Sequence, residues 1–174
     1  MDKRIIQTKS KLKNALILLL EDTDLCDITV SRLCSQAHVN RSTFYVYYGN
    51  VTECFDEIAD AIIEEMRRSL YREPDRSHKT YLRIYFQTAR KYKSIFRAIH
   101  RMGIHNTMIH KMVDVFNEVF HNQIYIPSDS EHLEYSYLFS GFYGMVEVWL
   151  TNGCKQSDEE LIEILESFIY TVQS

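Results

Sequence analysis

The sequence has few residues that interrupt helices and no long apolar run. Its 174 residues include only two prolines and five glycines, so breakers rarely divide the chain. The longest apolar run, residues 15–20, is far shorter than the roughly 18 residues of a membrane-spanning helix. The charged beginning MDKRIIQTKSK does not resemble a signal peptide. We therefore expect a cytoplasmic, all-α protein with no membrane partner.

Signals for catalysis and for metal binding are also scarce. The four cysteines show no C-x-x-C spacing, which favours reduced thiols over a disulfide or a metal site. His100, His105 and His110 recur at five-residue intervals, whereas ligands on one helix face are three or four residues apart. No Ser-His-Asp order, glycine-rich phosphate loop or paired carboxylate site stands out. The sequence therefore predicts a non-enzyme without a metal or cofactor.

Charge is divided unevenly along the chain. Residues 1–50 carry seven Lys or Arg against five Asp or Glu, a net charge of +2. Residues 51–174 carry thirteen against nineteen, a net charge of −6. A nucleic-acid-binding protein can show this division if only its first third contacts phosphates.

Apolar residues recur at helical spacing along nearly the whole chain, which predicts an all-α fold of about nine helices. Pro74 to Ser77 is the best internal boundary, so we expect residues 1–50 and 74–174 to form two domains joined by a long helix over 50–73. "IYIPSDSEH" predicts a loop around Pro127. The other expected helices span 3–21, 29–36, 40–47, 78–91, 93–101, 104–122, 131–151 and 158–172.

Capping residues define the short helices near the N-terminus. Thr29 and Asn40 stand where N-caps are expected. Asn50 is followed three residues later by Glu53, the spacing of a capping box. His38 stands between the second and third helices, where a turn is needed. The first three helices therefore predict a helix-turn-helix domain.

The third of these helices contains an unusual stretch, NRSTFYVYYGN, which is rich in both aromatic and small polar residues. We expect Phe44 to point into the core, and the outward side chains to be those of Arg41, Ser42, Thr43, Tyr45 and Tyr47. Short donors and hydroxylated rings on an outward face suit phosphates and base edges of DNA. The expected DNA-binding residues are Thr29, Asn40, Arg41, Ser42, Thr43, Tyr45, Tyr47 and Asn50. In the first helix, Lys9, Lys11 and Lys13 are either phosphate contacts or a solvated face.

Residues 29–48 follow a pattern of fixed spacing, T-V-x-x-(I/L)-(A/C)-x-x-A-x-V-x-(R/K)-x-T-(F/L)-Y-x-(H/Y)-(F/Y). It is met by Thr29, Val30, Leu33, Cys34, Ala37, Val39, Arg41, Thr43, Phe44, Tyr45, Tyr47 and Tyr48. With this pattern, residues 28–55 resemble the DNA-binding domain of the tetracycline-repressor (TetR/AcrR) family of bacterial regulators. The resemblance implies operator binding by a dimer and, in most members, control by a small molecule.

Three positions depart from the family pattern. His38 replaces the Gly that often forms the turn, although His tolerates a positive φ better than most residues. Val51 replaces the Lys that usually holds a phosphate, which leaves the backbone N–H groups of the helix start to favour an anion. Arg32 replaces an acidic residue. We expect DNA binding to survive these changes.

Residues 139–161 resemble the C-terminal region of a branch of the family common in Gram-positive bacteria. The resemblance rests on G-x-x-G at Gly141 and Gly144, on Trp149-Leu150, on Asn152-Gly153 and on the cap at Ser157 to Glu160. It implies that the last two helices pair with their copies in a second subunit as a four-helix bundle. The expected interface residues are Phe139, Phe142, Val146, Trp149, Leu161, Leu165, Phe168 and Val172.

The middle of the chain is rich in Tyr, Phe and Met. Most of these residues are expected to form a packed core, and the alternative is an apolar ligand pocket with a few polar groups. Family members usually carry such a pocket. The pocket candidates are Tyr85, Phe86, Phe96, Met112, Phe116, Tyr143 and Glu147.

Together these observations predict a TetR-type repressor that binds a palindromic double-stranded operator as a homodimer and is released by a small-molecule effector. The alternative is a relative without operator binding that acts as a protein-interaction or ligand-sequestering partner.

Overall fold

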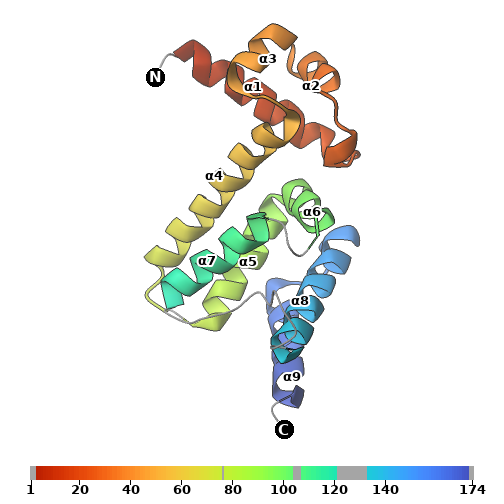
Figure 1. Ribbon diagram of the computed structural model, residues 1–174. Helices are drawn as coiled ribbons and strands as arrows, with labels where there is room; N and C mark the ends of the chain where they lie inside the picture. Colours follow the sequence, from red (N-terminus) through yellow and green to blue (C-terminus); the bar gives the residue numbers. More distant parts are fainter. Residues whose placement is uncertain (1–2, 76, 104–106, 121–132, 173–174) are drawn as a thin grey trace. The chain divides into compact units, whose positions relative to one another are not determined.

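The computed structural model describes residues 3–75, 77–103, 107–120 and 133–172, and over these ranges it contains nine α-helices and no strand (Figure 1). The all-α prediction is confirmed, and the helix bounds agree with the predicted ones to within a few residues. The ends of the predicted helices 104–122 and 131–151, and the loop around Pro127, lie outside these ranges. The helices are α1 (Lys3–Leu19), α2 (Val30–Ala37), α3 (Arg41–Tyr47), α4 (Val51–Arg72), α5 (His78–Lys91), α6 (Lys93–Arg101), α7 (Thr107–Phe120), α8 (Leu133–Thr151) and α9 (Asp158–Val172).

The chain forms two compact units, residues 1–61 and 62–174, and the uninterrupted helix α4 contributes residues to both. The sequence places domain boundaries at the ends of this helix, at residues 50 and 74. The division into compact units falls between Ala61 and Ile62, inside this helix. A short 3-10 turn, Leu25–Asp27, lies in the connection between α1 and α2.

The N-terminal unit is built on large apolar side chains from its helices. Leu12 and Leu16 of α1, Leu33 of α2, Phe44 of α3 and Phe55 of α4 are all fully buried. Their spacing puts one apolar stripe of each helix toward a shared core. Burying a side chain of this size stabilises the fold by about 1.5–3 kcal/mol.

Glu57 of α4 is the electrostatic centre of this unit. Its carboxylate lies 2.6 Å from Lys9 Nζ and 2.9 Å from Lys13 Nζ, and it accepts a 2.9 Å hydrogen bond from the Tyr48 hydroxyl. Burial alone would raise the pKa of Glu57, but the hydrogen bonds from Lys9, Lys13 and Tyr48 outweigh it and lower that pKa to about 2. The cluster therefore ties α1 to α4.

The predicted caps hold the short helices in place. Thr29 accepts a 3.2 Å hydrogen bond from Arg32 N at the start of α2. Asn50 Oδ1 accepts a hydrogen bond from Glu53 N at 2.9 Å, and Glu53 Oε2 accepts one from Gly49 N at 2.7 Å. Asn40 occupies the N-cap of α3 without a capping hydrogen bond from its side chain. The predicted starts of α2 and α4 are thus confirmed in their hydrogen bonds.

His38 closes α2 in the left-handed conformation, with φ 52° and ψ 45°. Its N–H donates to Ser35 O at 3.2 Å, and the next N–H, of Val39, donates to Cys34 O at 3.0 Å. These bonds satisfy carbonyls at the end of α2, as in other helix C-caps. The side chain of His38 is exposed, so its strain is not offset by packing.

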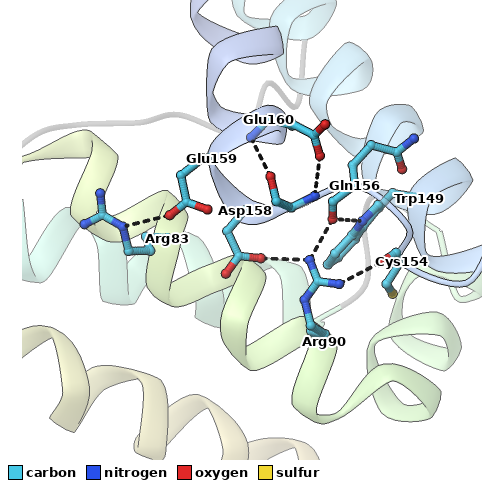
Figure 2. Close-up of polar contacts among 9 residues, drawn as sticks. Arg83, Arg90, Trp149, Cys154, Gln156, Asp158, Glu159 and Glu160 are labelled. Carbon is cyan, nitrogen blue, oxygen red and sulfur yellow. Dashed lines mark hydrogen bonds and ion pairs between the residues drawn. The ribbon is translucent and has the colours of Figure 1, made fainter.

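The C-terminal unit has an aromatic core and a polar clamp over the turn between α8 and α9. Arg90 of α5 donates to Cys154 O at 2.6 Å, to Gln156 O at 2.7 Å and to Asp158 Oδ1 at 3.0 Å (Figure 2). Its guanidinium also lies 5.1 Å from the centre of the Trp149 ring. One arginine therefore joins α5 to both ends of the α8–α9 turn.

Substituting His38 by Gly should stabilise the protein. A non-Gly residue in the left-handed region costs on the order of 1 kcal/mol, and the exposed imidazole makes no compensating contact in the core. We expect the free energy of unfolding, measured with urea, to rise by about that amount in His38→Gly. The control is Gln36→Gly at an exposed position inside α2, which should lose about 1 kcal/mol. A His38→Gly variant less stable than wild type would contradict this account.

Candidate nucleic-acid interface, ligand site and subunit face

The outward face of α3 carries most of the residues expected to bind DNA. Arg41 and Ser42 are exposed, and Tyr45 is 52% exposed. Thr43 and Tyr47 are half-buried at the edge of this face. Phe44 is fully buried, and its ring contacts the rings of Tyr45 and Tyr48 at centroid distances of 5.5 and 5.7 Å. The core therefore fixes which way the helix faces.

No acidic residue stands between Asp27 and Glu53, although the chain contains 24 of them. This span covers α2, the turn at His38, α3 and the first residues of α4. It carries Arg32 and Arg41 as fixed positive charges. A surface that lacks carboxylates and presents hydroxyl and guanidinium donors is suited to a polyanion.

The lysines of α1 differ in their surroundings. Lys9 and Lys13 are paired with Glu57, as described above, whereas Lys11 is exposed. Pairing with Glu57 offsets part of the positive charge of Lys9 and Lys13, whose side chains remain partly exposed. Arg32 donates to Thr23 Oγ1 at 3.0 Å and so braces the start of α2.

The start of α4 differs from the anion site that its position suggests. Val51 is buried and belongs to the core. The carboxylate of Glu53 lies beside the helix start, where it accepts hydrogen bonds from Gly49 N and, at 3.2 Å, from Asn50 Nδ2. This negative charge occupies the region where a phosphate was expected. Thr29 and Asn50 are exposed, but each is engaged in its own cap.

Most of the pocket candidates form close ring contacts in the core of the C-terminal unit. Tyr85 lies 5.5 Å from Phe96, and Tyr81 lies 4.6 Å from Phe116, both edge to face. Phe86 and Met112 are also buried, whereas Tyr143 is half-buried and Glu147 is exposed. A shallow polar depression lies elsewhere, over Arg90 and residues 155–160, and its side chains belong to the clamp already described.

His100 of α6 is the unusual polar residue of this core. It is only 3% exposed, its Nε2 lies 3.2 Å from the Tyr85 hydroxyl, and its buried Nδ1 has no hydrogen-bond partner. The Tyr143 ring stacks on the imidazole at 4.5 Å, and the Tyr143 hydroxyl donates to the His100 carbonyl. Burial lowers the pKa of His100 to about 4. The ring is therefore neutral at physiological pH, with one unsatisfied nitrogen.

The expected interface residues differ in their surroundings. Val146, Trp149 and Leu161 are buried within the subunit. Periodicity identifies the apolar faces of a helix, but it does not show whether the same chain or a partner covers them. Phe142 and Leu165 are half-buried. The side chains of Phe139, Phe168 and Val172 lie outside the part of the chain that is described.

A different face of α8 is exposed. Tyr137 is 71% and Val148 60% exposed, and Ser140 and Gly141 lie between them at helical spacing. A Cβ placed on Gly141 or Gly144 would meet nothing within 4 Å. On α9, Ile164 is also exposed. The sequence signal for this face is the G-x-x-G pair at Gly141 and Gly144. The residues predicted from the sequence to form the interface do not include Tyr137, Val148 and Ile164.

The described residues contain no group of three His, Cys, Asp or Glu side chains placed to hold a metal ion. His100 is buried and His110 exposed, while His105 lies outside the described ranges. All four cysteines are free thiols. In the same ranges, no helix combines the length and apolar character needed to span a bilayer.

Several solved structures share this fold. A TetR transcriptional regulator from Streptococcus agalactiae is 20% identical, with 97% of this chain and 96% of that chain covered and a TM-score of 0.71. NalD of Pseudomonas aeruginosa, the secondary repressor of the MexAB-OprM multidrug efflux pump, is 14% identical. The match covers 95% of this chain and 97% of that chain, with a TM-score of 0.66. FadR of Thermus thermophilus, a TetR-family repressor in complex with lauroyl-CoA, is also 14% identical (93% of each chain, TM-score 0.56).

At these identities the structures establish the fold alone. A search of curated protein sequences finds no match. The family itself is shown by a model described as "Transcriptional regulator C-terminal region", of the TetR type, which matches residues 76–171. This match covers more than half of the chain, and the protein belongs to the TetR family of transcriptional regulators.

Proposed function

We propose that the protein is a homodimeric repressor that binds a palindromic DNA operator through α3 and is released by a small-molecule effector. The observation that carries the proposal is the division of α3 between a buried Phe44 and an exposed polar face, in a stretch without carboxylates. Fold relatives support it, because NalD and the lauroyl-CoA-bound FadR are described as repressors. The likeness to the Streptococcus protein supports assignment to the Gram-positive branch.

A dimer is required because one α3 contacts too few base pairs for useful specificity. Half to two-thirds of protein–DNA hydrogen bonds only position the backbone. Two copies related by a two-fold axis would read half-sites about 34–36 Å apart. We propose that they pair through the exposed face of α8, Tyr137 to Val148, with Ile164 of α9. Helix α8 carries apolar side chains on all its sides, and a helix of this kind is covered on more than one face.

The effector is proposed to bind near His100. A buried nitrogen without a partner costs about 1–3 kcal/mol, so a ligand that satisfies Nδ1 gains that energy. Because the ring is neutral, it can offer one hydrogen bond but no charge. Its surroundings are the rings of Tyr85 and Tyr143. These features suit a largely apolar molecule with one uncharged polar group. Binding releases DNA only if the effector prefers the conformation that does not fit the operator.

Operator binding is tested by selecting duplexes from a random DNA library with the wild-type protein, and by a gel shift with the DNA upstream of its gene. Tyr45→Ala should weaken binding to the selected duplex about tenfold, since it removes an exposed hydroxyl group that can donate a hydrogen bond to a phosphate or a base. Tyr71→Ala is the control, because Tyr71 of α4 is similarly exposed but lies outside the N-terminal unit. If no duplex is enriched, the alternative of a relative without operator binding takes its place.

Charge introduced on the proposed face of α8 should dissociate the dimer. In Val148→Asp, two carboxylates, one from each subunit, would be buried in the proposed interface without partners, which costs several kcal/mol. Sedimentation should then show monomers at micromolar concentration, where wild type is dimeric. Leu18→Asp, at a similarly exposed apolar position on α1, should leave the dimer intact. A monomeric wild-type protein would refute the proposed assembly.

The buried His100 should make stability sensitive to mild acid. Its pKa is about 4 in the folded protein against 6.5 in the unfolded chain, so between these values the unfolded state binds more protons. The free energy of unfolding should therefore fall as pH is lowered from 6.5 to 4. His100→Gln keeps a hydrogen-bonding side chain that does not titrate, and urea unfolding should show a smaller fall over this interval. Equal falls in both proteins would mean that His100 is not buried as described.

A further inference from the structure

The side chains at the centre of the exposed face of α3 are not those that the motif emphasises. Successive positions of an α-helix are rotated by about 100°. Ser42 and Val46, each two positions from the buried Phe44, therefore both point roughly 160° away from it. Arg41 and Tyr45 lie on one side of the line through Ser42 and Val46, and Thr43 and Tyr47 lie on the other side. The half-burial of Thr43 and Tyr47 agrees with a place on the flank.

Val46 is an apolar side chain exposed at this central position. It is 73% exposed, the largest value among the exposed large hydrophobic residues in the described part of the chain. The other exposed residues of α3 are Arg41, Ser42 and Tyr45, each of which carries a polar group, so Val46 does not continue an extended apolar patch along this helix. A single apolar side chain on a face with hydroxyl and guanidinium groups is complementary to a surface that carries one small apolar group among polar ones.

The major groove of DNA presents one such group. Among the base edges there, only thymine carries an apolar substituent, the C5-methyl, and it lies between hydrogen-bonding groups and the phosphate walls. We propose that Val46 reads a thymine methyl in each half-site, with Ser42 beside it on the groove floor and the two flanks directed toward phosphates. The β-branched side chain has few rotamers, so little conformational entropy is lost on contact. This inference rests on the proposed operator binding.

The test uses uracil, which differs from thymine only by lacking that methyl. Duplexes selected by the wild-type protein are resynthesised with each thymine of the half-site replaced by uracil, symmetrically in both half-sites. At one position wild-type affinity should fall about fourfold per methyl, or roughly fifteenfold for the two half-sites, as expected for a buried CH₂-sized group. Val46→Ala should bind the thymine duplex more weakly and lose the difference between thymine and uracil at that position.

Leu18→Ala, which shortens another exposed apolar side chain of the same unit, should keep the full thymine preference. Circular dichroism should show Val46→Ala as folded as wild type, because the side chain is largely in solvent. If Val46→Ala keeps the thymine preference at every position, or if wild type shows none, the proposed contact is wrong although operator binding stands. If no duplex is selected at all, operator binding itself fails, and the inference fails with it.

Discussion

The burial of Phe44 is the constraint on which the proposed DNA-binding surface depends. A seven-residue helix such as α3 has little stability of its own, and its orientation depends on the Phe44 ring in the core of the N-terminal unit, with the buried Tyr48 ring beside it. Once Phe44 is fixed, geometry alone decides which residues of the helix face outward. This geometry divides the polar and aromatic residues of the stretch NRSTFYVYYGN between the core and the surface.

In the C-terminal unit, Arg90 has a comparable organising role. Its hydrogen bonds reach both ends of the turn between α8 and α9, and its guanidinium covers Trp149 (Figure 2). Helix α5 also supplies Tyr85, which contacts His100. Helix α5 therefore contacts both the proposed effector site and the turn that joins α8 to α9. A shift of α5 on effector binding would be transmitted to α8 and α9 through fixed hydrogen bonds, with no need for a flexible linker.

The sequence was sufficient for the features that depend on local signals. Helical periodicity and the scarcity of Pro and Gly predicted the nine helices, and Thr29 and Asn50 marked two of their starts. Contacts between distant residues left no such signal. The pairing of Lys9 and Lys13 with Glu57, the orphaned nitrogen of His100 and the burial of Val146 within its own subunit all depend on tertiary packing. The apolar pattern of α8 showed that it needs cover, but not which face is covered by its own chain.

The Glu57 cluster has a consequence for the ionic strength at which the protein could hold DNA. Each phosphate neutralised by a Lys or Arg releases counterions, and the logarithm of affinity falls with that of salt by about 0.9 per contact. Lys9 and Lys13 already pair with the Glu57 carboxylate, so they are less available to replace the cations condensed on DNA phosphates. The gain in entropy on binding would then come from fewer released cations than the number of lysines in α1 suggests. The fall of affinity with salt would be correspondingly less steep.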